Sequence, residues 1–174
     1  MMTSVKFHSG IVVWGVITND INLINNIATI ISLDFGKIIL RSRIIPFDYT
    51  NYYELEMGKN LNRQWLVTEK IIDLQDMSNI KLYAINLENK YKSNNKRKIN
   101  IDPGFLTLSN FILVTTKNYA HRIYLKDTIY AEVTLIYKDH TFQALDWTYP
   151  DYRDNIDFFN QARSLYQQLI YEKS

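Results

Sequence analysis

The sequence predicts an α+β fold in which a ferredoxin-like βαββαβ core is extended by an antiparallel β-meander and a C-terminal helix. The hydrophobic periodicity passes from strand to helix to two strands, and then to a second helix and another strand. Several short strand patterns follow, and a last helical pattern closes the chain. The 174 residues contain no repeat and no Pro/Gly/Ser-rich linker, so we expect a single domain over residues 1–174.

The first strand and the first helix carry the strongest patterns. Residues 10–17 form a continuous apolar, β-branched run, which is typical of a strand buried on both faces. Residues 24–31 repeat isoleucine and alanine at helical spacing, with Thr18 or Asn19 as the expected cap and Gly36 as the stop. The apolar run is too short for a membrane helix, which needs about 20 residues. We therefore expect a cytoplasmic protein without a membrane partner.

The next segments complete the predicted core. Residues 37–45 are expected to form a strand that ends at Pro46, because proline cannot donate to the ladder. Residues 47–60 are rich in Tyr, Glu and Asp and are expected to be irregular. Residues 63–71 alternate as a third strand, and Asp73 can cap the second helix.

A basic segment follows this helix. Residues 90–98 hold five basic side chains, which indicate either a phosphate-binding loop or, as we favour, a solvated helix exit. Residues 99–101 are expected to be extended. Residues 102–104 (Asp-Pro-Gly) predict a turn, because proline presets φ and glycine permits a positive φ.

The C-terminal part predicts the meander and the closing helix. Residues 111–116, 120–125, 129–137 and 141–145 each have the length and composition of a short strand. Asp154 is the expected cap of the last helix.

Composition and motifs exclude several classes of protein. Twenty basic and 18 acidic residues give a formal charge of only +2, which argues against a large nucleic-acid footprint. Cysteine is absent, so thiolate metal sites and cysteine nucleophiles are excluded. Gly10 and Gly15 match part of a P-loop, but Val16 and Ile17 follow where the loop needs Lys and then Ser or Thr, and no G-x-G-x-x-G occurs.

Two acidic positions are candidates for acid/base or Mg²⁺ chemistry. Glu54 and Glu56 would share one face on a strand, but they lie in a stretch expected to be irregular, so we favour exposed loop carboxylates. Asp102 lies at the predicted turn, where it either bonds its own backbone or contributes to a site.

A third group of candidates lies on the meander. On the predicted strand, His121 and Arg122 would point to opposite faces. Glu132 lies in the middle of the next strand, and a buried carboxylate there needs a partner, for which Arg122 or Lys117 is suited. Residues 147–152 (WTYPDY) are either a packing latch, which we favour, or a stacking platform.

Five segments together resemble an uncharacterised prokaryotic domain-of-unknown-function family, some members of which carry an automatic "GTP-binding protein" label. The segments are PFDYTNYYELEMG (46–58), NIDPG (100–104), KNYAHRIYL (117–125), IYAEVTL (129–135) and WTYPDY (147–152). The resemblance implies no activity. It draws attention to polar positions, namely Asp48, Tyr52, Tyr53, Glu56, Arg63, Asp102, Lys117, His121, Arg122, Glu132, Tyr149 and Asp151.

These observations favour an enzyme that handles a small molecule or nucleotide. The expected catalytic residues are Asp102, His121, Glu132 and Glu56, with Mg²⁺ as a candidate cofactor. The expected substrate-binding residues are Arg122, Lys117, Tyr52, Tyr53, Asp48, Arg63 and Tyr149. The alternative is a non-catalytic RNA- or protein-binding module, in which the basic loop contacts phosphates and tyrosines stack on bases.

Overall fold

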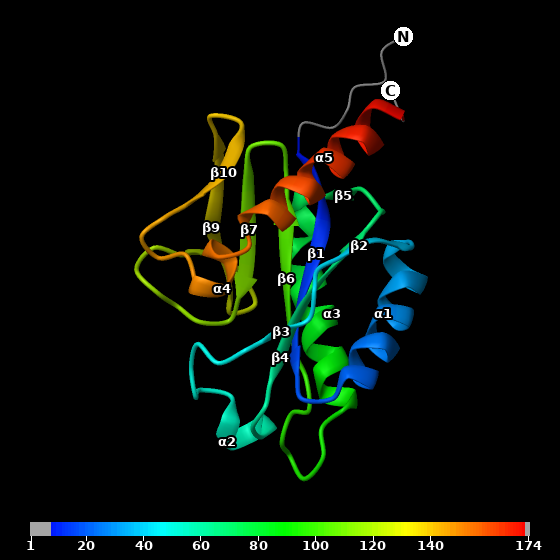
Figure 1. The fold of residues 1–174 in the computed structure, drawn as a ribbon, viewed down its shortest axis with the longest axis vertical. Coiled ribbons are helices and arrows are strands. Elements are labelled where there is room, and N and C mark those ends of the chain that lie inside the picture. Colours follow the sequence, from blue (N-terminus) through cyan, green and yellow to red (C-terminus); the bar gives the residue numbers. More distant parts are fainter. Residues whose placement is uncertain (1–7, 173–174) are drawn as a thin grey trace.

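A computed structural model describes residues 8–172, which form one ten-stranded antiparallel sheet with helices on both faces (Figure 1). The main path of the sheet has the order β10-β9-β7-β6-β1-β4-β2. The strands are β1 (Ser9–Thr18), β2 (Ile38–Arg41), β3 (Ile45–Pro46), β4 (Asn62–Thr68), β5 (Ile72–Asp73), β6 (Asn100–Leu106), β7 (Asn110–Thr115), β8 (Ile123–Lys126), β9 (Ile129–Lys138) and β10 (Thr141–Ala144). The helices are α1 (Ile21–Phe35), α2 (Glu54–Met57), α3 (Met77–Lys90), α4 (Pro150–Arg153) and α5 (Ile156–Glu172), with a 3-10 turn, η1 (Leu74–Asp76), before α3. The α+β class with a C-terminal helix is thus confirmed.

Strand β1 lies at the centre and is buried on both faces, as its composition predicts. Val12, Trp14 and Val16 contribute to the core beneath α1 and α3. Ile11 and Val13 contribute to a second core, which α4 and α5 cover on the opposite face.

Several boundaries differ from the sequence-based expectation. The predicted strand over residues 37–45 divides into β2 and β3, because the Ser42 hydroxyl accepts a hydrogen bond from the Trp65 amide at 2.9 Å and interrupts the regular ladder. The cap of α1 is Asp20 rather than Thr18 or Asn19, since its carboxylate accepts from the Asn22 amide. Asp154 does not cap the last helix but ends α4.

The Asp-Pro-Gly segment is not a turn but lies inside β6. Ile101 directs its amide and carbonyl away from β1, so the alternation of a strand places the missing N–H of Pro103 on the same side. This side of β6 has no neighbouring strand until Gly104, and an open edge tolerates proline. Glycine is required at 104, because a Cβ there would lie 2.0 Å from Cζ of Phe111.

Strands β6 and β7 separate at one end of the sheet. They pair only from Gly104 to Leu106. Beyond that point β6 continues alongside β1, whereas Val114 and Thr115 of β7 remain paired with β9. The separation opens the sheet between two central strands.

No helix within residues 8–172 is both long and apolar enough to span a membrane.

Candidate functional site

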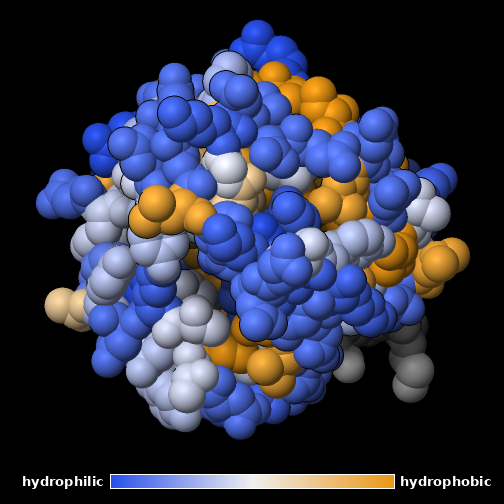
Figure 2. Space-filling view, turned by 90° about the horizontal axis from the view of Figure 1, so that it is seen from below, coloured by the Kyte–Doolittle hydropathy of each residue, from blue (hydrophilic) through white to orange (hydrophobic). Residues whose placement is uncertain are grey.

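A cleft of about 560 Å³ lies where β6 and β7 separate. Its walls come from residues 47–53, from α3 and the segment after it, from β6, from residues 113–122 and from α4. Figure 2 views the end of the molecule that carries α2 and shows a largely hydrophilic face with a hollow near its middle. The volume falls in the range of about 300–1,000 Å³ that is usual for small-molecule sites.

Two charged side chains of α3 close the open edge of β6. Glu88 Oε1 accepts a hydrogen bond from the Ile101 amide at 2.7 Å, and Lys81 Nζ donates to the Ile101 carbonyl at 3.3 Å. These groups replace the backbone partners that β7 would have supplied. Burial raises the pKa of Glu88, because Lys81, the Ile101 amide and Arg97 compensate only part of the cost of desolvating its carboxylate.

Asp102 lies at the floor of the cleft in a fully paired setting. Its carboxylate accepts from Lys81 Nζ at 3.2 Å and from Asn100 Nδ2 at 2.7 Å. Burial acts to raise the pKa of Asp102, but Lys81 and Arg63 outweigh it and hold the pKa below its ordinary value. Asp102 is therefore an anion at neutral pH.

Arg63 is a buried cation that joins three elements. Its Nε donates to Oδ2 of Asp151 on α4 at 3.0 Å, and Nη2 lies 3.0 Å from the same oxygen in an ion pair. The guanidinium lies over the rings of Phe47, Trp65 and Tyr152. Burial opposes its charge, but Tyr152, Asp151 and Asp102 raise its pKa. Gly15 makes room for it, because a Cβ there would lie 2.5 Å from Nη1 of Arg63.

Arg97 connects the basic segment to the irregular segment. Its Nε and Nη2 donate to the two carboxylate oxygens of Glu56 at 2.9 and 2.8 Å, and its backbone amide also donates to Glu56 at 3.0 Å. On its other side, Nη1 donates to Asn100 Oδ1 at 2.9 Å and lies 3.7 Å from Glu88. The hydrogen bonds from Arg97 are the main reason that the pKa of Glu56 is lowered.

Glu132 organises the opposite rim. This buried carboxylate uses Oε2 to accept from His121 Nε2 and from Arg122 Nε, both at 2.8 Å. Arg122 also donates to the Tyr149 hydroxyl and to the backbone carbonyl of Lys117. Burial opposes the charge of Arg122, but its bonds to Glu132 and Tyr149 raise its pKa.

The expectation that His121 and Arg122 point to opposite faces is wrong. Strand β8 begins only at Ile123, and the Arg122 amide donates to the Tyr119 carbonyl in a turn. The alternation of a strand therefore does not apply, and both side chains reach Glu132. Arg122 is thus its cationic partner, whereas Lys117 lies over the ring of Tyr52, 4.0 Å from the centroid.

Tyrosines and cations dominate the cleft. The six lining tyrosines, out of 13 in the chain, are Tyr49, Tyr52, Tyr53, Tyr119, Tyr149 and Tyr152. The six lining cations are Arg63, Lys81, Lys92, Arg97, Lys117 and Arg122, whereas the lining carboxylates are only Glu88, Asp102 and Asp151. Among residues 8–172, neither Lys92 nor Lys117 has a carboxylate partner. The cleft is therefore locally positive in a chain of nearly balanced charge.

The structure brings most of the expected site residues together. Those that line the cleft are Asp102, Arg63, Lys117, Arg122, Tyr52, Tyr53 and Tyr149. Glu56 and Glu132 lie one contact away, through Arg97 and Arg122, and His121 lies behind Glu132. Asp48 is exposed and does not line the cleft.

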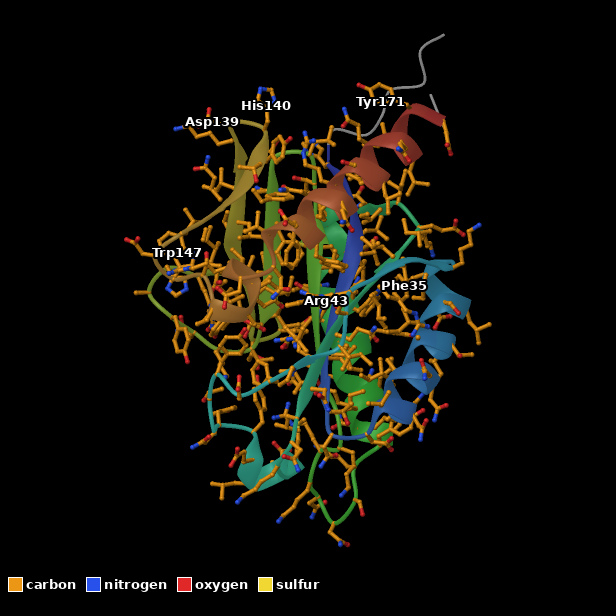
Figure 3. All side chains as sticks on the ribbon, viewed as in Figure 1. Phe35, Arg43, Asp139, His140, Trp147 and Tyr171 are labelled. Atoms are coloured by element: carbon orange, nitrogen blue, oxygen red, sulfur yellow. The ribbon has the colours of Figure 1, made fainter. Side chains whose placement is uncertain are left out.

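The aromatic segment 147–152 acts both as a latch and as a wall. Trp147 stacks on His121 at 5.0 Å and donates to the Val133 carbonyl, whereas Tyr152 is buried in the core. Tyr149 lines the cleft. Figure 3 labels Trp147 beside this rim and His140 at the β9–β10 turn, which lies at the end of the sheet away from α2.

Three residues of the cleft were not among the expected site residues, namely Lys81, Glu88 and Arg97. Lys81 and Glu88 carried a usable signal, because they fall at helical spacing within the apolar stripe of α3. Arg97 lies in the basic segment but is turned inward, unlike the exposed lysines around it. Within residues 8–172, no three His, Asp or Glu side chains are grouped to hold a metal ion.

The protein therefore has an α+β fold with a large antiparallel sheet. A polar, tyrosine-rich pocket lies where two central strands, β6 and β7, separate. A family model, Domain of unknown function (DUF4416), matches residues 9–166. The chain belongs to this uncharacterised family, which confirms the resemblance. Searches of curated proteins and of solved structures found no significant match.

Proposed function

We propose that the protein binds an anionic small molecule in the β6–β7 cleft and acts on it as an enzyme. The observation that carries this proposal is that, among the described residues, Lys92 and Lys117 line one small-molecule-sized cavity without a carboxylate partner, whereas the other four lining cations are each paired. Lys117 is central, because its ammonium group lies against a tyrosine face and its charge is not cancelled by a carboxylate among the described residues. Phosphate and carboxylate groups are the ligands that such cations prefer.

In this proposal the predicted catalytic residues have different tasks. Glu132 fixes the ring of His121 through Nε2, and Nδ1 is the ring nitrogen to which we assign proton exchange, at the rim outside the cleft lining. Asp102 remains ionised and contributes charge to the floor of the cleft. Glu56 holds Arg97. Mg²⁺ remains a candidate only through a ligand phosphate, since the oxygens of Asp102 are already engaged.

A thermal unfolding screen with matched pairs of compounds tests the binding step. Each pair consists of a sugar or nucleoside and its monophosphate. We expect some phosphorylated members to raise Tm while their neutral partners do not, because a ligand that binds only the folded state stabilises it. Lys117→Gln should reduce the shift, and Lys138→Gln, the same charge change on exposed residue 138 of β9, should not. Equal effects of the two variants would contradict binding in the cleft.

The catalytic step needs its own variant. With a substrate from this screen, His121→Asn should abolish turnover while the ligand-induced rise in Tm persists. Unchanged turnover in this variant would remove His121 from the proposal.

A second candidate is an RNA-binding module, which the exposed lysines of segment 90–98 and the exposed ring of Tyr52 favour. RNA binding would weaken steeply with salt and would depend on these lysines. Absence of RNA retention at low salt would eliminate this candidate.

Two further proposals concern the fold of the core and the location of the protein in the cell. A ferredoxin-like core is supported by the order β6-β1-β4-β2 and by α1 and α3 lying against one face, with β7 to β10 as the extension. A cytoplasmic location stays a prediction, consistent with a chain that lacks cysteine.

A further inference from the structure

Arg97 and Glu56 together have the geometry of an occupied anion receptor. Three donors of Arg97, namely Nε, Nη2 and the backbone amide, converge on one carboxylate at 2.8–3.0 Å. A planar fork with an added amide is how proteins bind carboxylate or phosphate groups of ligands. In this protein the bound carboxylate is the side chain of Glu56, and not a ligand.

The receptor is held in place without help from Glu56. Nη1 of Arg97 donates to Asn100 on β6 and lies near the buried Glu88 on α3. Arg97 also lines the cleft, which Glu56 does not. If Glu56 moved away, the guanidinium would stay at the cavity wall with its fork free.

Glu56 comes from a loop that closes on itself at its base. Residues 47–61 form a closed loop, because the Phe47 amide donates to the Leu61 carbonyl at 2.8 Å. Met57 and Leu61 pack with Ile17 at its base. Among residues 8–172, the Glu56–Arg97 contact is the one ion pair that connects this loop to the rest of the protein.

The exposure of the pair permits exchange with an external anion. The side chains of Arg97 and Glu56 are 21% and 32% exposed, in contrast to the nearly buried Arg63 and Asp151. Both side chains remain in contact with water, so a ligand anion can reach the fork and compete with Glu56 for it.

We propose that Arg97 is the anion receptor of the cleft, that Glu56 occupies it in place of a ligand phosphate or carboxylate, and that the ligand releases the 47–61 loop. This inference rests on the proposed anion binding. It adds that Arg97 is the group that binds the anion and that the 47–61 loop is the segment that the anion releases. Tyr52 and Tyr53, which line the cleft from the same loop, would move with Glu56.

Two matched variants test the displacement. Glu56→Gln and Glu54→Gln each remove one negative charge from α2, and within residues 8–172 Glu54 forms no ion pair. Inorganic phosphate and acetate, titrated separately at constant ionic strength and followed by NMR, report the affinity for each kind of oxyanion. We expect Glu56→Gln to bind at least one of them about tenfold more tightly than Glu54→Gln. Arg97→Lys, which keeps the charge but loses the fork, should bind it more weakly than the wild type.

Hydrogen exchange in the wild-type protein tests the release without any variant. Phosphate or acetate should accelerate exchange in residues 47–61. If Glu56→Gln binds no more tightly than Glu54→Gln, or if exchange in the loop stays the same or slows, the displacement is wrong while anion binding stands. If no form of the protein binds either anion, the displacement and the proposed function both fail.

Discussion

At the scale of single residues, most charges of the cleft have a defined partner, and among the described residues Lys92 and Lys117 lack a carboxylate. Glu132 is the clearest case, because one buried carboxylate oxygen serves both His121 and Arg122 at 2.8 Å. Such pairs stabilise little when compared with an apolar core, but removing one member leaves the other charge buried and alone. Sequence reasoning found Glu132 and Arg122 for this reason: a carboxylate in the middle of an apolar strand requires a cation.

Glu132→Ala should therefore lower the free energy of unfolding by about 3–5 kcal/mol, because the nearly buried Arg122 side chain loses its carboxylate. Urea denaturation measures the loss, and Glu172→Ala on the exposed end of α5 is the control, with an expected change within about 0.5 kcal/mol. A loss below about 1 kcal/mol for Glu132→Ala would mean that the pair is not a structural unit.

Gly104→Ala should destabilise the protein by about 1–3 kcal/mol, because the new methyl group would overlap the ring of Phe111. The double variant with Phe111→Leu should be less destabilised than the sum of the two single changes, since the smaller side chain relieves the overlap. Additive losses would show that the contact between residues 104 and 111 does not limit substitution.

At the scale of elements, local patterns predicted the strands and helices but not the parting of β6 from β7. The continuous apolar run of β1 and the apolar stripe of α3 are local signals, and both elements formed as expected. The Asp-Pro-Gly segment looked like a turn because those residues favour turns locally. It is instead a strand, because Lys81 and Glu88 of the preceding helix, α3, supply the hydrogen bonds of its open edge.

Glu88 gives a test of this edge. Glu88→Gln keeps an oxygen for the Ile101 amide and removes a charge whose burial raises the pKa, so its stability at pH 7 should equal or exceed that of the wild type. Glu88→Ala leaves the buried amide without a partner and should cost about 1–3 kcal/mol. Equal stabilities of the two variants in urea denaturation would contradict the role of this side chain.

The contact between Glu56 and Arg97 makes the 47–61 loop sensitive to acid. Because the pKa of Glu56 is lowered in the folded protein, its stabilising contribution is present above the unfolded value of about 4.3 and is lost as the pH falls through the lower folded pKa. We expect NMR signals of residues 47–61 to change in that acid range, and Glu56→Gln to lack this step. A step of the same size in Glu56→Gln would assign it to another group.

At the scale of the whole molecule, a nearly neutral chain concentrates its cations at one opening. The net charge of +2 gave no hint of this, because charges distant in sequence meet only when the sheet forms. The resemblance to the family directed attention to Arg63, Lys117 and Arg122, which do line the cleft. Arg97 could not be ranked from sequence, because its importance depends on which way the basic segment faces.

The central claim is that the β6–β7 cleft binds an anion. Its most direct test is NMR chemical-shift mapping with a nucleoside monophosphate and its parent nucleoside. We expect the monophosphate to change the chemical shifts of amides around Arg97, Asp102, Lys117 and Arg122. In Lys117→Gln these changes should be much smaller. Perturbations confined to the outer lysines of segment 90–98, or equal perturbations with the neutral nucleoside, would contradict it.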